Sequence, residues 1–154
     1  MPSISNKGNL MPESPIRKLV PYAEKAKKKG IKVFHLNIGQ PDIETPKSAL
    51  KAVKNADIKV LAYSKSEGDL NLREKISDYY SRHNVKISSS DIIITSGASE
   101  ALLFTIGSIM DSMDEIIIPE PFYANYNGFS AANGVNIVPV SSSIDDNFSL
   151  PNIE

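Results

Sequence analysis

The chain has 154 residues, enough for one domain with its own core, and 41% of them are hydrophobic. Its 17 Lys and Arg residues balance 18 Asp and Glu residues, so it lacks the basic surface typical of nucleic-acid-binding proteins. It contains no cysteine, which excludes disulfides and thiolate metal sites, and no apolar run approaches the ~20 residues that span a membrane.

The amino-terminal part is predicted to form an irregular arm followed by one helix. Residues 1–13 are polar and rich in proline, without the apolar core of a signal peptide, so we expect a cytoplasmic protein. A helix is predicted over 14–29, with Ser14 as its cap and Gly30 as its stop. Pro21 conflicts with an uninterrupted helix, and it should kink the helix or delay its start.

Farther along the chain, predicted strands and helices alternate. Short β-branched or apolar runs indicate strands, and helical spacing of apolar residues indicates helices. The predicted strands cover 32–37, 91–95, 115–118 and 135–140, and the predicted helices cover 46–54, 71–83, 98–110 and 123–132. This alternation is typical of an α/β fold with helices packed on a mostly parallel sheet. The last residues, 141–154, are polar and end without a closing element.

The predicted helix at 98–110 is apolar around most of its circumference. Such a helix should be buried between the sheet and a second layer. Its apolar residues are Ala98, Ala101, Leu102, Leu103, Phe104, Ile106, Ile109 and Met110.

The turn between the predicted strand at 91–95 and this helix is suited to binding an anion. Gly97 lies in the turn, and a helix that begins there presents free backbone N–H groups at the positive end of its dipole. Ser96 and Ser99 add hydroxyl donors beside the same point, so a phosphate is the expected ligand. The simpler alternative is that Gly97 only permits the turn and that Ser99 caps the helix.

The same residues suggest a second class of function. The stretch 97–101 is a near match to the G-x-S-x-G turn of acyl hydrolases, with Ser99 as the nucleophile. Ala101 replaces the final glycine of that motif. Both histidines, His35 and His83, precede Ser99, whereas the catalytic histidine of that fold follows the serine. Both observations oppose an acyl hydrolase, which is kept as the alternative to the phosphate-binding turn.

Three further segments resemble parts of a ligand site. In LNIGQPD (36–42), Gly39 follows a predicted strand and permits close approach of the backbone to a ligand. The second segment is YSKSEG (63–68). The third is PEPFY (119–123), at the carboxyl end of a predicted parallel strand, where ligands of open sheets bind and an aromatic ring can stack on a flat cofactor.

These motifs, in this order and spacing, resemble the amino-terminal half of a pyridoxal-phosphate-dependent aminotransferase of class I or II, with an aspartate-aminotransferase-like fold of type I. The motifs are LNIGQPD, TP, YSKSEGDLNLRE, ITSGASEAL and IIIPEPFYANY, and the resemblance runs from about residue 31 to residue 140. It implies that residues 1–30 form an amino-terminal arm and helix. Residues 31–154 would form an incomplete cofactor-binding large domain.

The resemblance also implies an activity, the transfer of an amino group between an amino acid and a 2-oxo acid through pyridoxal phosphate. Gly97, Ala98 and Ser99 match the turn that grips the cofactor phosphate in this family. Tyr123 matches the aromatic residue that stacks on the pyridine ring, although a tyrosine packed in the interior is the simpler explanation.

Other matches concern the substrate and a second subunit. Gly39 matches the glycine near the substrate α-carboxylate. Tyr63 matches the tyrosine whose hydroxyl reaches the phosphate in the partner subunit's site, which implies a homodimer. Arg73 falls in the Leu-Arg pair of the family, where we expect a structural role.

The family's remaining catalytic residues lie beyond the matched region. They are the Schiff-base lysine, the acidic partner of the pyridinium nitrogen and the substrate-binding arginine. Lys65 follows a serine, as the Schiff-base lysine often does, but it lies within the Tyr63 motif and is a poor candidate. We therefore expect a catalytically incomplete front part of an aminotransferase. A non-catalytic binding module with the same fold is the third alternative.

Overall fold

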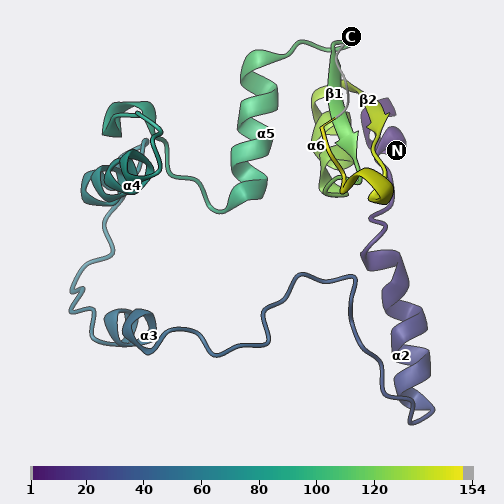
Figure 1. Cartoon of the computed structure of the whole chain (residues 1–154), viewed down its shortest axis with the longest axis horizontal. Coiled ribbons are helices and arrows are strands. Elements are labelled where there is room, and N and C mark those ends of the chain that lie inside the picture. The colour runs from purple at the N-terminus through teal and green to yellow at the C-terminus, as the bar shows by residue number, and fades with distance from the viewer. Residues whose placement is uncertain (1, 151–154) are drawn as a thin grey trace. The chain divides into compact units, whose positions relative to one another are not determined.

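The computed structural model describes residues 2–150, which fall into two compact units (Figure 1). Of the described residues, one unit comprises 2–38 and 96–150, and the other comprises Gly39–Thr95. The helices and strands of the first unit are α1 (Asn6–Leu10), α2 (Val20–Lys28), α5 (Ala98–Ile109), β1 (Glu115–Glu120), α6 (Asn125–Asn133) and β2 (Asn136–Ser141). Those of the second unit are α3 (Lys47–Lys54) and α4 (Leu70–Arg82).

The first unit contains a parallel pair of strands joined through a helix. β1 and β2 pair in parallel, with Ile117 opposite Val138, and α6 connects them and contacts β2 (Figure 1). Gly134 ends α6 in the left-handed conformation at φ +73°, which glycine adopts without strain. Ile118 and Val135 are buried at this junction. The predicted α/β fold with a parallel sheet is therefore confirmed.

Helix α5 begins at Ala98 as predicted and packs against α6. Gly107 permits a close approach, because a Cβ atom there would lie 2.8 Å from the Asn133 side-chain oxygen. The expectation of a fully buried α5 was wrong. Only its Ile106 is buried, whereas Phe104 is 55% and Ile109 73% exposed. The physical reason is that α6 is the only helix or strand of the described residues that packs against α5.

The amino-terminal helix starts later than the pattern over 14–29 predicted. A 3-10 turn at Arg17–Leu19 precedes α2, which begins at Val20 with Pro21 in its first turn, where no N–H donor is needed. The Ser14 hydroxyl accepts the Arg17 N–H at 3.3 Å, but the N-cap of the 3-10 turn is Ile16, so the predicted cap at Ser14 was wrong. Proline therefore delays the α-helix, one of the two outcomes expected of it.

Two predicted strands, 32–37 and 91–95, are not strands in the structure. Among residues 2–150 only β1 and β2 form a ladder, and a segment without a ladder partner is not a strand. In the first segment the Leu36 N–H donates to the Phe34 carbonyl at 3.2 Å, which makes a tight turn. In the second, the Ile94 N–H donates to the carbonyl of Glu67 at 3.0 Å.

The second unit follows the predictions for 46–54 and 71–83, which form α3 and α4 with ends shifted by one residue. Asp69 caps α4, because its carboxylate accepts the Leu72 N–H at 2.9 Å. A 3-10 turn at Ser89–Asp91 follows α4, and hydrogen bonds from Ser88 lower the pKa of the Asp91 carboxyl. No helix within residues 2–150 has both the length and the apolar character that a membrane crossing demands.

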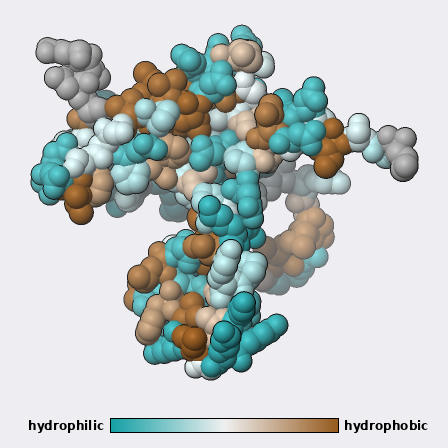
Figure 2. Space-filling model, turned by 90° about the vertical axis from the view of Figure 1, so that its right-hand side faces the viewer, coloured by the Kyte–Doolittle hydropathy of each residue, from teal (hydrophilic) through white to brown (hydrophobic). Residues whose placement is uncertain are grey.

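The 154 residues on their own are expected to be poorly packed. Ile106, Ile118 and Val135 are the buried hydrophobic residues among those described, and apolar surface is widely exposed on the face in Figure 2. We expect the isolated chain to bind the dye ANS and to melt without a sharp transition. A monomer of this chain with a cooperative melt and no ANS binding would contradict the prediction.

Candidate functional site

The turn before α5 has a backbone conformation that requires glycine. Gly97 is the N-cap of this 12-residue helix and has φ +91° and ψ 170°, a combination that residues with a Cβ atom rarely adopt. Ala98 and Ser99 are the first two residues of the helix and are exposed. Their N–H groups lie where a helix has no internal acceptors, at the positive end of its dipole. The first residues of α5 are therefore exposed at the positive end of its dipole, as the predicted phosphate site requires.

Serine 99 does not cap the helix, so the simpler explanation of this residue was wrong. Gly97 occupies the N-cap position without a side-chain cap, and the Ser99 hydroxyl makes no hydrogen bond to any described residue. Its exposed hydroxyl is available to a ligand beside the first N–H groups of the helix.

Glu100 holds the turn by a hydrogen bond to the backbone, a role that the sequence analysis missed. Its carboxylate accepts the Ser96 N–H at 2.5 Å, and the side chain is half-buried. The carboxylate therefore holds the N–H of the residue that precedes Gly97. An acidic residue in the first turn of a helix is the signal that could have indicated this hydrogen bond.

Tyr123 lies just after β1. Its side chain is not packed in the interior but lines a small cavity. The cavity has a volume of about 320 Å³, and its other lining residues are Ser14, Ile16, Arg17, Val20, Ile38 and Asn125. Tyr123 is 47% exposed, and its hydroxyl accepts a hydrogen bond from the Asn125 amide at 2.5 Å. Its ring meets the edge of Tyr126 at a centroid distance of 6.3 Å. A half-exposed, oriented ring in a cavity wall can stack on a flat ligand.

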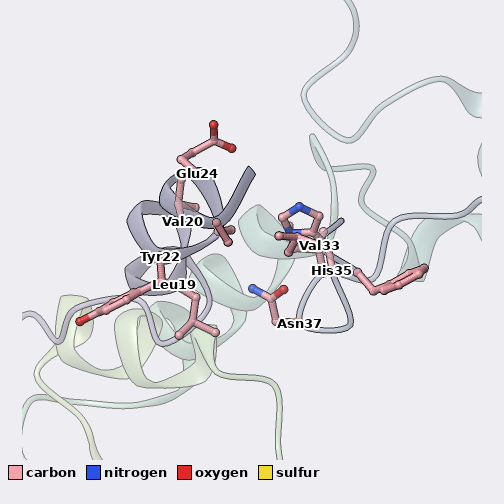
Figure 3. A pocket seen from close by; sticks show the side chains of 11 residues that line it. Leu19, Val20, Tyr22, Glu24, Val33, His35 and Asn37 are labelled. Carbon is pink, nitrogen blue, oxygen red and sulfur yellow. The ribbon is translucent and has the colours of Figure 1, made fainter. Parts of the chain in front are cut away.

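A second cavity, of about 360 Å³, lies between α2 and the segment 33–38 (Figure 3). Asn37 anchors this segment by donating to the Ile16 carbonyl at 3.2 Å. At its rim, a hydrogen bond from Lys27 lowers the pKa of the Glu24 carboxyl. Ile38 lines this cavity as well as the one beside Tyr123.

The predicted site residues divide between the two units. Gly97, Ala98 and Ser99 lie together at the start of α5, in the unit that also contains Tyr123, although the turn does not line the cavity beside Tyr123. Gly39 and Tyr63 belong to the other unit. A Cβ atom on Gly39 would meet no atom within 4 Å. The Tyr63 side chain is fully exposed.

The structure is an α/β fold with a glycine-dependent turn before α5 and, after β1, a cavity that Tyr123 lines. Residues 31–151 match the family described as Aminotransferase class I and II. A (5-formylfuran-3-yl)methyl phosphate transaminase of Methanocaldococcus jannaschii is 40% identical over 113 residues, 72% of this chain. An aspartate aminotransferase of Pyrococcus horikoshii is 35% identical over 119 residues, 76% of this chain.

Solved structures agree with the sequence comparison. An alanine aminotransferase of Pyrococcus furiosus covers 95% of this chain at 32% identity and a TM-score of 0.82. An aspartate aminotransferase of Thermotoga maritima covers 97% of it at 28% identity and a TM-score of 0.86. The chain belongs to the class I and II aminotransferase family, which depends on pyridoxal phosphate.

The chain spans 30% and 29% of the two curated relatives, and 38% and 40% of the two solved chains. The match to aminotransferases covers the residues that suggested an acyl hydrolase, and neither that alternative nor a non-catalytic binding module is supported.

Proposed function

We propose that these residues belong to an aminotransferase that moves an amino group between an amino acid and a 2-oxo acid with pyridoxal phosphate as cofactor. The observation that carries this proposal is the turn before α5. Gly97 adopts a conformation reserved for glycine there, and Ala98 and Ser99 are exposed at the positive end of the helix. The donors at this turn are uncharged N–H and O–H groups, which suit a phosphate.

In the proposed site each residue has one task. The turn at Gly97 would hold the phosphate through the N–H groups of Ala98 and Ser99 and through the Ser99 hydroxyl. Tyr123 would stack on the pyridine ring and so orient it. Pyridoxal phosphate supplies the electron sink for amino-group exchange. The protein's contribution here is to bind and orient the cofactor.

The second unit contributes the remaining predicted contacts. Gly39 leaves room for the substrate carboxylate, because no atom lies within 4 Å of a Cβ atom placed on it. The exposed Tyr63 reaches the phosphate in a partner subunit, so the enzyme acts as a homodimer. A cytoplasmic location is part of this proposal.

The activity is tested with protein from the complete coding region that contains these residues. It is incubated with ¹⁵N-labelled amino acids and 2-oxo acids, with and without pyridoxal phosphate, and mass spectrometry detects labelled product. We expect cofactor-dependent transfer of ¹⁵N to at least one 2-oxo acid. Absence of transfer across acidic, aromatic and aliphatic amino acids would overturn the proposal.

Replacement of Ser99 by Ala and of Tyr123 by Ala should have different consequences for cofactor binding. Loss of the Ser99 hydroxyl removes a hydrogen bond to a charged group, worth ~1.5–3 kcal/mol. We expect a weakening of about tenfold or more for pyridoxal phosphate and no change for pyridoxal, which has no phosphate. Loss of the Tyr123 ring removes ~0.5–1.5 kcal/mol of stacking, so both compounds should bind more weakly by up to about tenfold.

Spectral titration measures the four dissociation constants. Ser108→Ala is the matched control, because Ser108 is exposed in the same helix and its hydroxyl bonds only to the Phe104 carbonyl, at 2.6 Å. If Ser99→Ala weakens pyridoxal and pyridoxal phosphate equally, Ser99 does not contact the phosphate.

A further inference from the structure

Arg73 in the first turn of α4 is a buried cation that connects separate parts of the second unit. Its side chain is only 7% exposed. The guanidinium donates to the Gly68 carbonyl at 3.3 Å and to the Ser89 carbonyl at 2.7 Å, and it approaches the Glu67 carboxylate at 3.5 Å. One side chain therefore joins the turn before α4 to the turn after it.

The residues held by Arg73 also contact the segment that runs toward the phosphate turn. The Glu67 carbonyl accepts the Ile94 N–H at 3.0 Å. Gly68, at φ +93°, packs so closely on Ile94 that a Cβ atom on the glycine would lie 2.5 Å from the Ile94 Cβ atom. This contact fixes residues 67–68 against a segment that ends at Thr95, immediately before the turn.

The same residues anchor the loop that carries Tyr63. The Gly68 N–H donates to the Lys65 carbonyl at 2.9 Å and closes a tight turn over 65–68. This turn begins two residues after Tyr63, whose own side chain contacts nothing that would hold it, since it is fully exposed. The position of Tyr63 thus depends on the turn, and the turn is fastened by the guanidinium of Arg73.

We propose that Arg73 is a positioning residue: its buried guanidinium holds the 63–68 loop in the place from which Tyr63 reaches the cofactor phosphate. This inference rests on the proposed function, because Tyr63 has a task only if the phosphate is bound. A planar fork with five donors can serve three acceptors at once, whereas a lysine ammonium cannot match that geometry. The position therefore requires the planar shape of the arginine side chain as well as its positive charge.

The first experiment measures how firmly the loop is held, without cofactor, in protein from the complete coding region. Trypsin cleaves after Lys65, which is exposed in the turn. Arg73→Met should speed this cleavage by about tenfold, and Arg73→Lys should give an intermediate rate. Arg82→Met is the matched control, since Arg82 is exposed in the last turn of the same helix, and its rate should equal that of the unaltered protein.

The second experiment asks whether Arg73 acts through Tyr63. Affinity for pyridoxal phosphate is measured for Tyr63→Phe, Arg73→Lys and the double variant, with pyridoxal as the reference compound. We expect each single change to lower the affinity for pyridoxal phosphate. The affinity of the double variant should be no lower than that of the single variant with the lower affinity. Arg73→Lys keeps the charge, so this comparison remains available if Arg73→Met does not fold.

Three outcomes would overturn the inference. They are cleavage after Lys65 at the same rate in Arg73→Lys and in the unaltered protein, losses of affinity that add in the double variant, and equal weakening of pyridoxal and pyridoxal phosphate. Failure of the proposed function would look different, because the unaltered protein would then bind pyridoxal as tightly as pyridoxal phosphate. The cleavage result would still report on the loop in that case.

Discussion

Replacement of Gly97 by Ala should lower the affinity for pyridoxal phosphate by about a hundredfold. At φ +91° and ψ 170° a Cβ atom introduces strain of ~1–3 kcal/mol, so the turn will relax to another conformation. The N–H groups of the turn then no longer converge on the phosphate. Each lost hydrogen bond to a charged group costs ~1.5–3 kcal/mol, and the loss of one or two bonds gives a weakening on the order of a hundredfold.

Gly128→Ala is the control for this experiment. Gly128 lies within α6, and a Cβ atom there would meet only the Met11 sulfur, at an ordinary distance of 3.8 Å. Its affinity for the cofactor, measured by spectral titration in protein from the complete coding region, should be unchanged. If Gly97→Ala bound pyridoxal phosphate as tightly as Gly128→Ala, the turn before α5 would not be the phosphate site.

Gly68→Ala should be the most destabilising single-methyl change in the second unit, by about 3 kcal/mol. The added Cβ atom combines the strain of φ +93° with an approach of 2.5 Å to the Ile94 Cβ atom, which belongs to the most rigid part of that side chain. Either the 65–68 turn or the segment 92–95 must shift to relieve the contact. Urea denaturation, followed by circular dichroism, measures the loss of free energy of unfolding.

Gly30→Ala separates the two causes of this effect. Gly30 has a similar φ of +77°, but a Cβ atom there would meet nothing within 4 Å. We therefore expect Gly30→Ala to show only the cost of the backbone conformation, about 1 kcal/mol. Equal losses for the two variants would mean that Gly68 is not packed against Ile94.

The helices were predictable because their signals are local. The start of α5 at Ala98 and the delay caused by Pro21 each depend on residues within one turn of the helix end. The strand pair β1 and β2 was equally predictable, since a short helix between two apolar runs brings the runs together in parallel.

The segments 32–37 and 91–95 show where this approach failed. Their β-branched and apolar residues permit a strand, but a strand also needs a neighbour with which to form a ladder. The Ile94 N–H instead donates a hydrogen bond to the Glu67 carbonyl in a loop, and Leu36 lies in a turn. The apolar pattern of α5 likewise predicted burial without indicating which elements would cover it.

Of the candidate site, the part encoded in one continuous stretch was predictable. The turn at Gly97 and the start of α5 at Ala98 lie where the sequence predicted them, and phosphate binding there stays a prediction. The hydrogen bond between Glu100 and Ser96 and the presence of Arg17 in the cavity beside Tyr123 were missed. The first has a local signal, an acidic residue in the first turn of the helix, whereas the second depends on packing between distant segments, which spacing along the chain does not specify.

Hydrogen exchange of the backbone amides tests the central claim most directly, because the claim concerns N–H donors. Protein from the complete coding region is exposed to deuterium with pyridoxal phosphate, with pyridoxal, or with neither, and peptides covering 96–103 are analysed by mass spectrometry. The account predicts strong protection of the amides of Ala98 and Ser99 with pyridoxal phosphate and little with pyridoxal. Unchanged exchange of these two amides under saturating pyridoxal phosphate, with protection elsewhere, would contradict it.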